Sequence, residues 1–223
     1  MTATTIAELP KTARERGKIA PAKFAHVVLR SKNIARLIEF YKTVLEAEAT
    51  YGDNNAAFLT YDDEHHRVAV VQMPGLFSPS RGRVGMDHFA FTYATLGDLL
   101  ATYKRLKGEG ILPVWTTNHG VTFSFYYQDP DKNVFELQID VFDNPEELHA
   151  YFMSEDFNNN PIGVDFDADN ILARFEAGEP EEQLLYRNAD GPRDMKTMPR
   201  EIIGTFNWLM IRVLGVFGIK PIA

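Results

Sequence analysis

Three side chains of this sequence are suited to holding a transition metal. His26 and His88 lie in apolar, strand-like runs sixty-two residues apart, and Glu136 lies inside a third apolar run, V-F-E-L-Q-I. A buried glutamate without a partner is costly, so Glu136 calls for a cation or a donor close by. Two imidazoles and one carboxylate form the facial set that binds non-haem Fe(II) and leaves positions open for substrate and dioxygen. We therefore predict His26, His88 and Glu136 as metal ligands, with a pair of hydrogen-bonded core histidines as the alternative interpretation.

The two histidines occupy matching places in an internal repeat. The segment F-A-H-V-V-L-R is echoed by M-D-H-F-A-F-T, and each is followed by a helical pattern. The apolar residues at helical spacing are Ile34, Leu37, Ile38 and Tyr41 in the first copy, and Leu96, Leu99, Leu100 and Tyr103 in the second. Duplication of one module would place His26 and His88 near one pseudo-symmetry axis.

After each helical pattern, turn residues separate further strand-like runs. These runs are 56–61 and 67–73 in the first copy, after a shorter one, and 112–116, 121–127 and 134–139 in the second. The order of elements is therefore βαβββ, twice. We predict an α+β fold in which two βαβββ modules, about residues 24–74 and 86–142, pair into a curved sheet that encloses a metal cleft.

Charge separates this core from the rest of the chain. The net charge is +3, −3, −11 and +3 for residues 1–23, 24–142, 143–182 and 183–223. We predict a short N-terminal arm at 1–23, a core domain at 24–142, and an extension at 143–223 that is first acidic and then apolar and helical.

Composition excludes several classes of protein. The chain has no cysteine, which removes disulfide scaffolds, thiolate zinc sites, iron–sulfur clusters and cysteine nucleophiles. A net charge of −8 argues against nucleic acid and anionic membrane partners. The N-terminus lacks a secretion signal pattern, so we expect a cytoplasmic protein. Motifs for nucleotide binding and serine hydrolysis are missing from the sequence.

The segment H-G-V-T-F-S-F-Y-Y-Q-D-P-D-K-N-V-F-E, from His119 to Glu136, follows a family pattern of H-G, then tyrosine, then D-P-x-G-N before a ligand glutamate. Over about residues 20–142 the chain resembles the vicinal oxygen chelate superfamily, and within it the type I extradiol dioxygenases of aromatic catabolism. The resemblance implies the same ligands, His26, His88 and Glu136, for Fe(II), with Mn(II) equally suited to them. It also implies cleavage of a catechol-type diol by dioxygen, with both oxygen atoms incorporated.

The resemblance further implies roles for residues beside the metal. His119 and Tyr126 match the histidine and tyrosine that stabilise charge on substrate oxygen. His66, in E-H-H-R-V-A-V, matches the acid–base histidine, with His65 as its rival. Lys132 departs from the pattern, because the family has glycine at this turn, where positive φ costs another residue about 1 kcal/mol. The expected partners are an aromatic diol, dioxygen and further copies of the chain.

Two other functions on the same fold are open at this stage. A glyoxalase-like metal-dependent isomerase or lyase would need a fourth protein ligand, for which Gln72 is the candidate. A non-catalytic small-molecule-binding module would need neither the ligands nor the residues beside them. The joint presence of His66, His119 and Tyr126 favours the dioxygenase.

Two segments of the extension suggest other roles. Asp165–Glu176 has the oxygen-ligand spacing of a calcium loop, but Asn170 replaces its glycine, which favours a helix capped by aspartate. The apolar run 202–219 approaches the length of a membrane span, but it contains Asn207 and Arg212. We expect this run to pack over the cleft or at a subunit interface.

Overall fold

The computed structural model describes residues 8–77, 84–187 and 193–216. The chain divides into two compact units, Met1–Phe77 with Asn144–Met153 and Ser78–Asp143 with Ser154–Ala223. Each unit contains one of the two predicted modules.

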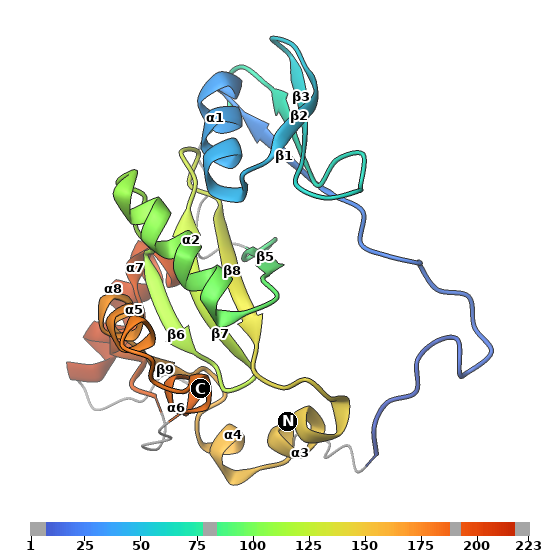
Figure 1. Ribbon diagram of the computed structural model, residues 1–223. Helices are drawn as coiled ribbons and strands as arrows, with labels where there is room; N and C mark the ends of the chain where they lie inside the picture. The colour runs from blue at the N-terminus through green and yellow to red at the C-terminus, as the bar shows by residue number, and fades with distance from the viewer. Residues whose placement is uncertain (1–7, 78–83, 188–192, 217–223) are drawn as a thin grey trace. The chain divides into compact units, whose positions relative to one another are not determined.

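The first module has the predicted βαβββ order (Figure 1). Its elements are β1 (Val27–Ser31), α1 (Ile34–Leu45), β2 (Glu48–Gly52), β3 (Ala56–Thr60) and β4 (Val68–Gln72). The strands form one sheet in the order β1-β4-β3-β2, with β1 parallel to β4 and the other pairs antiparallel. Asn33 caps α1 by accepting a hydrogen bond from the Arg36 amide. The buried face of α1, which includes Leu37 and Tyr41, packs against β3 and β4.

The second module repeats this order. Its elements are β5 (Phe89–Thr92), α2 (Leu96–Gly108), β6 (Trp115–Asn118), β7 (Thr122–Gln128) and β8 (Val134–Asp140). The sheet order is β5-β8-β7-β6-β9, in which β5 is parallel to β8 and β9 (Val164–Asp165) is a short strand that follows the module in sequence. The strand predicted at 112–116 begins at Trp115. The Ile111 amide still donates to the Leu106 carbonyl at the end of α2, and Pro113 has no amide hydrogen to pair with a neighbouring strand.

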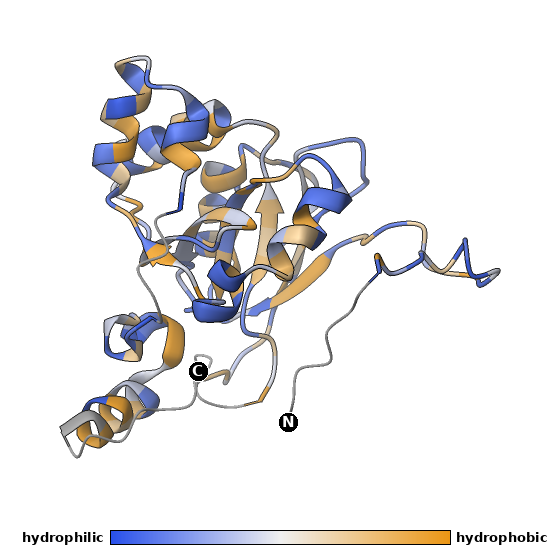
Figure 2. Ribbon diagram, turned by 90° about the horizontal axis from the view of Figure 1, so that it is seen from below, coloured by the Kyte–Doolittle hydropathy of each residue, from blue (hydrophilic) through white to orange (hydrophobic). Residues whose placement is uncertain are grey.

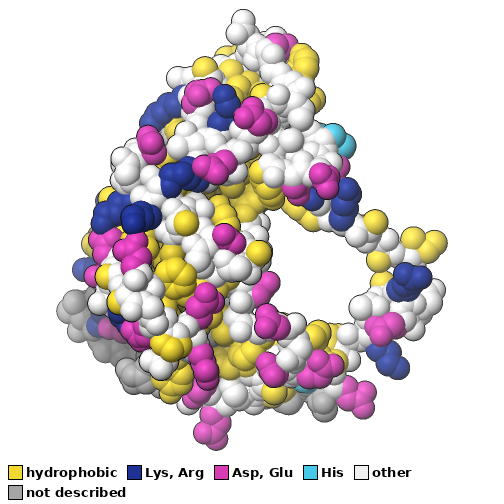
Figure 3. All heavy atoms as spheres, viewed as in Figure 1, with side chains coloured by type: hydrophobic (Ala, Val, Ile, Leu, Met, Phe, Trp, Pro, Cys, Tyr) yellow, Lys and Arg dark blue, Asp and Glu magenta, His cyan; other side chains and the backbone are white. Residues whose placement is uncertain are grey.

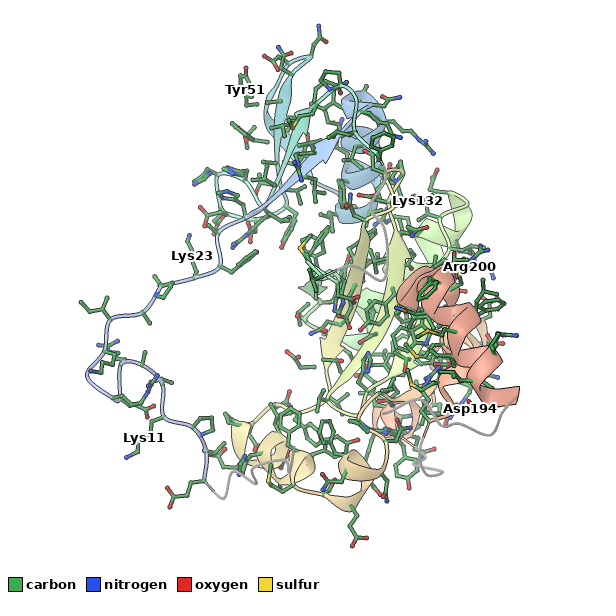
Figure 4. The ribbon with its side chains drawn as sticks, turned by 180° about the vertical axis from the view of Figure 1, so that it is seen from behind. Lys11, Lys23, Tyr51, Lys132, Asp194 and Arg200 are labelled. Carbon is green, nitrogen blue, oxygen red and sulfur yellow. The ribbon has the colours of Figure 1, made fainter. Side chains whose placement is uncertain are left out.

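The prediction for Lys132 is confirmed in the hairpin between β7 and β8. Lys132 has a φ angle of 75°, in the left-handed region that favours glycine, and Figure 4 shows it at the tip of this hairpin. The Asp129 carboxylate accepts hydrogen bonds from the amides of Asp131 and Asn133, at 2.9 and 2.8 Å, and from the Asn133 side chain at 2.7 Å. These bonds hold the turn in a conformation that is strained at Lys132.

The extension contains short helices and one short strand. They are α3 (Pro145–Phe152), α4 (Glu155–Asn159), β9 (Val164–Asp165), α5 (Ala168–Glu176), α6 (Glu181–Leu185), a 3₁₀ turn (Met195–Thr197), α7 (Arg200–Ile203) and α8 (Thr205–Val216). In Figure 2 these helices are banded in hydrophilic and hydrophobic colours, the pattern of amphipathic helices. Figure 3 shows Asp and Glu side chains gathered over the part of the chain that holds α3 and α4.

From Ser154 onward the extension belongs to the same unit as the second module. Strand β9 pairs with the edge of β6, and Phe166 stacks on Phe123 with ring centroids 4.0 Å apart. The Asp169 carboxylate accepts hydrogen bonds from Lys107 and Tyr103 of α2, at 2.6 and 2.8 Å. The aspartate-capped helix predicted here is confirmed, because Asp167 caps α5 through the amides of its first turn.

The apolar run 202–219 is interrupted inside the extension. Gly204, with φ 82°, separates α7 from α8, and residues 217–219 lie outside the described residues. Among the helices that the structure describes, none has both the length and the apolar character needed to span a membrane.

Candidate active site

His88 and Glu136 form a close pair on the second module. The strand β8 carries Glu136 opposite Ala90 of β5, and His88 lies two residues before Ala90. His88 and its counterpart His26 each lie directly before the first strand of their module, whereas the sequence placed them inside it. His88 Nε2 is 3.0 Å from Glu136 Oε2, and its Nδ1 is 2.8 Å from the Asp87 carboxylate.

The contact between His88 and Glu136 favours the charged form of each. The hydrogen bond to Glu136, helped by Asp87, raises the pKa of His88 although burial opposes it. Burial pushes the pKa of Glu136 upward, but hydrogen bonds from His88 and Ser124 outweigh it and lower that pKa. The proton on His88 Nε2 thus lies between this nitrogen and Glu136 Oε2, where a metal cation could bind both atoms instead. This donor pair fits a divalent metal.

His119 and Tyr126 lie next to this pair. His119 precedes Gly120 in the turn between β6 and β7, and Tyr126 lies on β7 directly opposite Glu136. His119 Nε2 is 2.9 Å from the Tyr126 hydroxyl. The rings of His88 and Tyr126 meet edge to face at 5.1 Å. The structure therefore brings four predicted site residues together on one sheet.

Burial determines the protonation states of His119 and Tyr126. It lowers the pKa of His119, which keeps the imidazole neutral near pH 7. Burial and the negative charge of Glu136 raise the pKa of Tyr126, which keeps its proton on the hydroxyl. The pair therefore combines a hydroxyl donor with an imidazole that can accept.

The other predicted histidines cluster on the first module. The ring centroid of His66 is 4.2 Å from that of His26 and 4.4 Å from that of His65. His66 also stacks on Phe58 of β3 at 4.8 Å, whereas the His65 side chain is 69% exposed. Burial, and then the neighbouring His26 and His65, lower the pKa of His66. These contacts support His66 over His65 as the acid–base residue.

The complete three-ligand set stays a prediction. His26 belongs to the first unit, and His88 and Glu136 belong to the second. Within the described ranges, no group of three or more histidine, aspartate or glutamate side chains is arranged to hold a metal ion.

Gln72 has a structural role. Its Oε1 accepts a hydrogen bond from the Ile34 amide, and its Nε2 donates to the Lys32 carbonyl, both at 2.9 Å. Both ends of the amide therefore hold the start of α1. A fourth metal ligand at this position would break these contacts, which counts against the isomerase alternative.

Sequence reasoning missed several neighbours of Tyr126. Trp115 of β6 stacks on the Tyr126 ring with centroids 4.8 Å apart. Its indole nitrogen donates to the Asp165 carboxylate at 2.7 Å, and the Arg193 guanidinium lies over its ring, 5.3 Å from the ring centroid. Met198 from the extension completes an apolar cluster with Trp115 and Tyr126. The extension residues belong to no motif. Tertiary contacts, such as the pairing of β9 with β6, show that they adjoin the site.

The chain matches one family model and two curated relatives, and a solved structure is similar to it. A family model described as the Glyoxalase/Bleomycin resistance protein/Dioxygenase superfamily matches residues 23–137. The chain is 45% identical over 166 residues to biphenyl-2,3-diol 1,2-dioxygenase 2 of Rhodococcus globerulus. The aligned residues cover 74% of this chain and 87% of that protein. Its identity to biphenyl-2,3-diol 1,2-dioxygenase 3 of the same organism is 42% over 167 residues, covering 74% and 88% of the two chains. A glyoxylase/bleomycin resistance protein/dioxygenase domain from Frankia sp. EAN1pec is a similar solved structure, with 18% identity, a TM-score of 0.47, and coverage of 58% of this chain and all of that one.

Proposed function

Because the chain belongs to the Glyoxalase/Bleomycin resistance protein/Dioxygenase superfamily, we propose that it is a ring-cleaving extradiol dioxygenase acting on a catechol-type aromatic diol. Its identity to two biphenyl-2,3-diol 1,2-dioxygenases, over most of each chain, bears out the dioxygenase class expected from the sequence. The observation that carries the proposal is the grouping of the His88–Glu136 pair with the Tyr126 hydroxyl and the neutral His119 imidazole.

The metal of this site is Fe(II) in our proposal, held by His26, His88 and Glu136. The donor chemistry fits, since His88 Nε2 and Glu136 Oε2 already face one another at 3.0 Å. Bound there, the ion supplies Lewis acidity toward the diol and a binding place for dioxygen. Asp87 contributes by accepting from the other ring nitrogen of His88, which orients the imidazole.

The chain's own groups move and hold protons in this reaction. His66, kept neutral by its surroundings, takes a proton from one diol oxygen and returns it later. Without substrate the Tyr126 hydroxyl donates its one proton to His119, which holds the hydroxyl in place. In the reaction the hydroxyl turns and donates this proton to the charge that develops on substrate oxygen. Trp115 and Met198 exclude water from one side of Tyr126.

Oxygen uptake tests this proposal. Protein loaded with Fe(II) without air, then given catechol or 2,3-dihydroxybiphenyl and air, should consume dioxygen and form a yellow product. His88→Ala protein treated in the same way is the control for iron that is free in solution. Fully iron-loaded protein that consumes no dioxygen with any tested diol would overturn the proposal.

A further inference from the structure

The extension forms a hydrogen bond with His119 Nδ1, the ring nitrogen that faces away from Tyr126. His119 Nδ1 is hydrogen-bonded to the backbone carbonyl of Ile162, between α4 and β9. The Arg187 guanidinium donates to the His119 carbonyl at 3.0 Å and also to the Asn160 carbonyl. We propose that the Ile162 carbonyl, held in place by Arg187, fixes His119 in the tautomer with its proton on Nδ1, so that Nε2 faces Tyr126 as an acceptor.

The assignment follows from what each partner can do. A backbone carbonyl only accepts hydrogen bonds, so Nδ1 must donate to it. In a neutral imidazole the other nitrogen then has a lone pair and must accept. The partner of Nε2 is the Tyr126 hydroxyl at 2.9 Å, which can donate. The opposite tautomer would set the Nδ1 lone pair against the Ile162 oxygen and leave two half-buried groups without a good hydrogen bond.

Several buried contacts hold the Ile162 carbonyl close to His119. The Asn160 side chain, 3% exposed, accepts from the Gly163 amide at 2.9 Å and donates to its carbonyl at 3.1 Å. On the facing turn, the Asn118 side chain donates to the Leu185 carbonyl at 2.8 Å and accepts from the Gly120 amide at 2.8 Å. Arg187 joins the two turns directly, because it reaches a carbonyl on each.

Gly163 shows how closely the two turns approach. It has a φ angle of 124°, and a Cβ atom there would lie 2.6 Å from the Asn118 carbonyl oxygen and 2.7 Å from Thr117 Oγ1. Only glycine fits this contact without displacing backbone. The segment that carries Ile162 is therefore docked tightly on the strand that leads to His119.

The tautomer determines where the Tyr126 proton is directed. The Tyr126 hydroxyl has one proton and lies 2.9 Å from His119 Nε2, while Glu136 lies opposite Tyr126 on the neighbouring strand. With Nε2 unprotonated, His119 can take this proton in a hydrogen bond and leave Glu136 to a metal. Arg187 is thus a positioning residue of the extension. Its effect on turnover rests on the proposed function, whereas the tautomer itself does not.

Nitrogen NMR of the histidine rings tests the proposal on the full-length, metal-free protein. Spectra that couple ring nitrogens to carbon-bound ring protons distinguish the two tautomers, and a His119→Asn variant assigns the His119 signals. In the wild-type protein we expect the His119 proton on Nδ1. A proton on Nε2 would overturn the proposal without any further variant.

Variants of Arg187 test its part in the arrangement. Arg187→Gln should mix the His119 tautomers and lower kcat about 10- to 100-fold, with KM and metal content unchanged. Arg187→Lys should give an intermediate effect, because an ammonium group lacks the fork that reaches two carbonyls. Arg174→Gln is the matched control, since Arg174 pairs with Glu179 inside the extension.

The outcomes separate the two proposals. A folded Arg187→Gln protein with wild-type His119 signals and wild-type kcat would refute the positioning role. If the spectra respond to Arg187→Gln as expected but no diol is cleaved, the proposed function fails and the tautomer assignment stands.

Discussion

Tyr126 and His88 are 5.1 Å apart between ring centroids, yet we assign them different roles. Tyr126→Phe should keep the metal, because phenylalanine removes only a hydroxyl from a packed ring, and should lower kcat about 10- to 100-fold. His88→Ala should abolish metal retention. Metal analysis beside oxygen uptake measures both effects. Equal loss of metal in the two variants would contradict this division of roles.

His66 and His65 are adjacent, but their surroundings differ. His66→Gln should lower kcat by about 100-fold or more, the usual contribution of a general base. His65→Gln, the matched control, should leave most activity because the His65 side chain is largely exposed. Since its surroundings lower the pKa of His66 from 6.5, the base is neutral at pH 7, and activity should fall only below about pH 6.5. The reverse order of the two variants in steady-state kinetics would identify His65 as the base.

At the scale of elements, the β7–β8 turn contains a correctable strain. Lys132→Gly should relieve the left-handed backbone, a gain of about 1–2 kcal/mol, partly offset by about 0.4–1 kcal/mol of added freedom in the unfolded chain. We expect the free energy of unfolding in urea to rise by the difference. Lys132→Ala retains the strain and should give no gain. If the φ of 75° cost nothing, Lys132→Gly would instead be less stable than Lys132→Ala, by about 0.4–1 kcal/mol of added freedom in the unfolded chain.

The elements that sequence patterns predicted are those with a clear period. Helices α1 and α2 begin at Ile34 and Leu96, where their apolar spacing begins. The capping residues Asn33 and Thr95 directly precede them. Strand β9 has two residues, too few to show any alternation. Its role in the site depends on tertiary pairing with β6, which local sequence does not encode.

The same limit applied to the site. His119, Tyr126 and Glu136 share one strand–turn–strand segment, so their spacing in sequence preserved their grouping in space. The partner of His119 Nδ1 is a backbone carbonyl, which every residue has, so the identity of Ile162 carried no signal. Nothing in the sequence distinguishes Arg187 from the other charged residues of the extension, because its role depends on two carbonyl groups that only the tertiary structure brings to it.

For the molecule as a whole, the boundary in composition differs from the boundary in contacts. Charge changes sharply at Asp143, but α3 belongs to the unit of the first module and α4 to α8 belong to that of the second. The extension is therefore part of the enzyme's architecture, since it supplies a strand to one sheet and contacts to Trp115 and His119.

The duplication of the module predicts that His26 is a metal ligand equivalent to His88. If both modules contribute a ligand, His26→Ala should lose metal as completely as His88→Ala, although the two histidines are sixty-two residues apart. We expect almost no metal to be retained after anaerobic loading and desalting, a larger loss than the roughly 10- to 100-fold drop in affinity on losing an outer partner. Added metal should raise the unfolding temperature of the wild-type protein but not of either variant. His149→Ala, which removes a histidine from α3, is the control and should bind normally. Full metal content in His26→Ala would leave the second module as the holder of the metal and require a different third ligand beside His88 and Glu136.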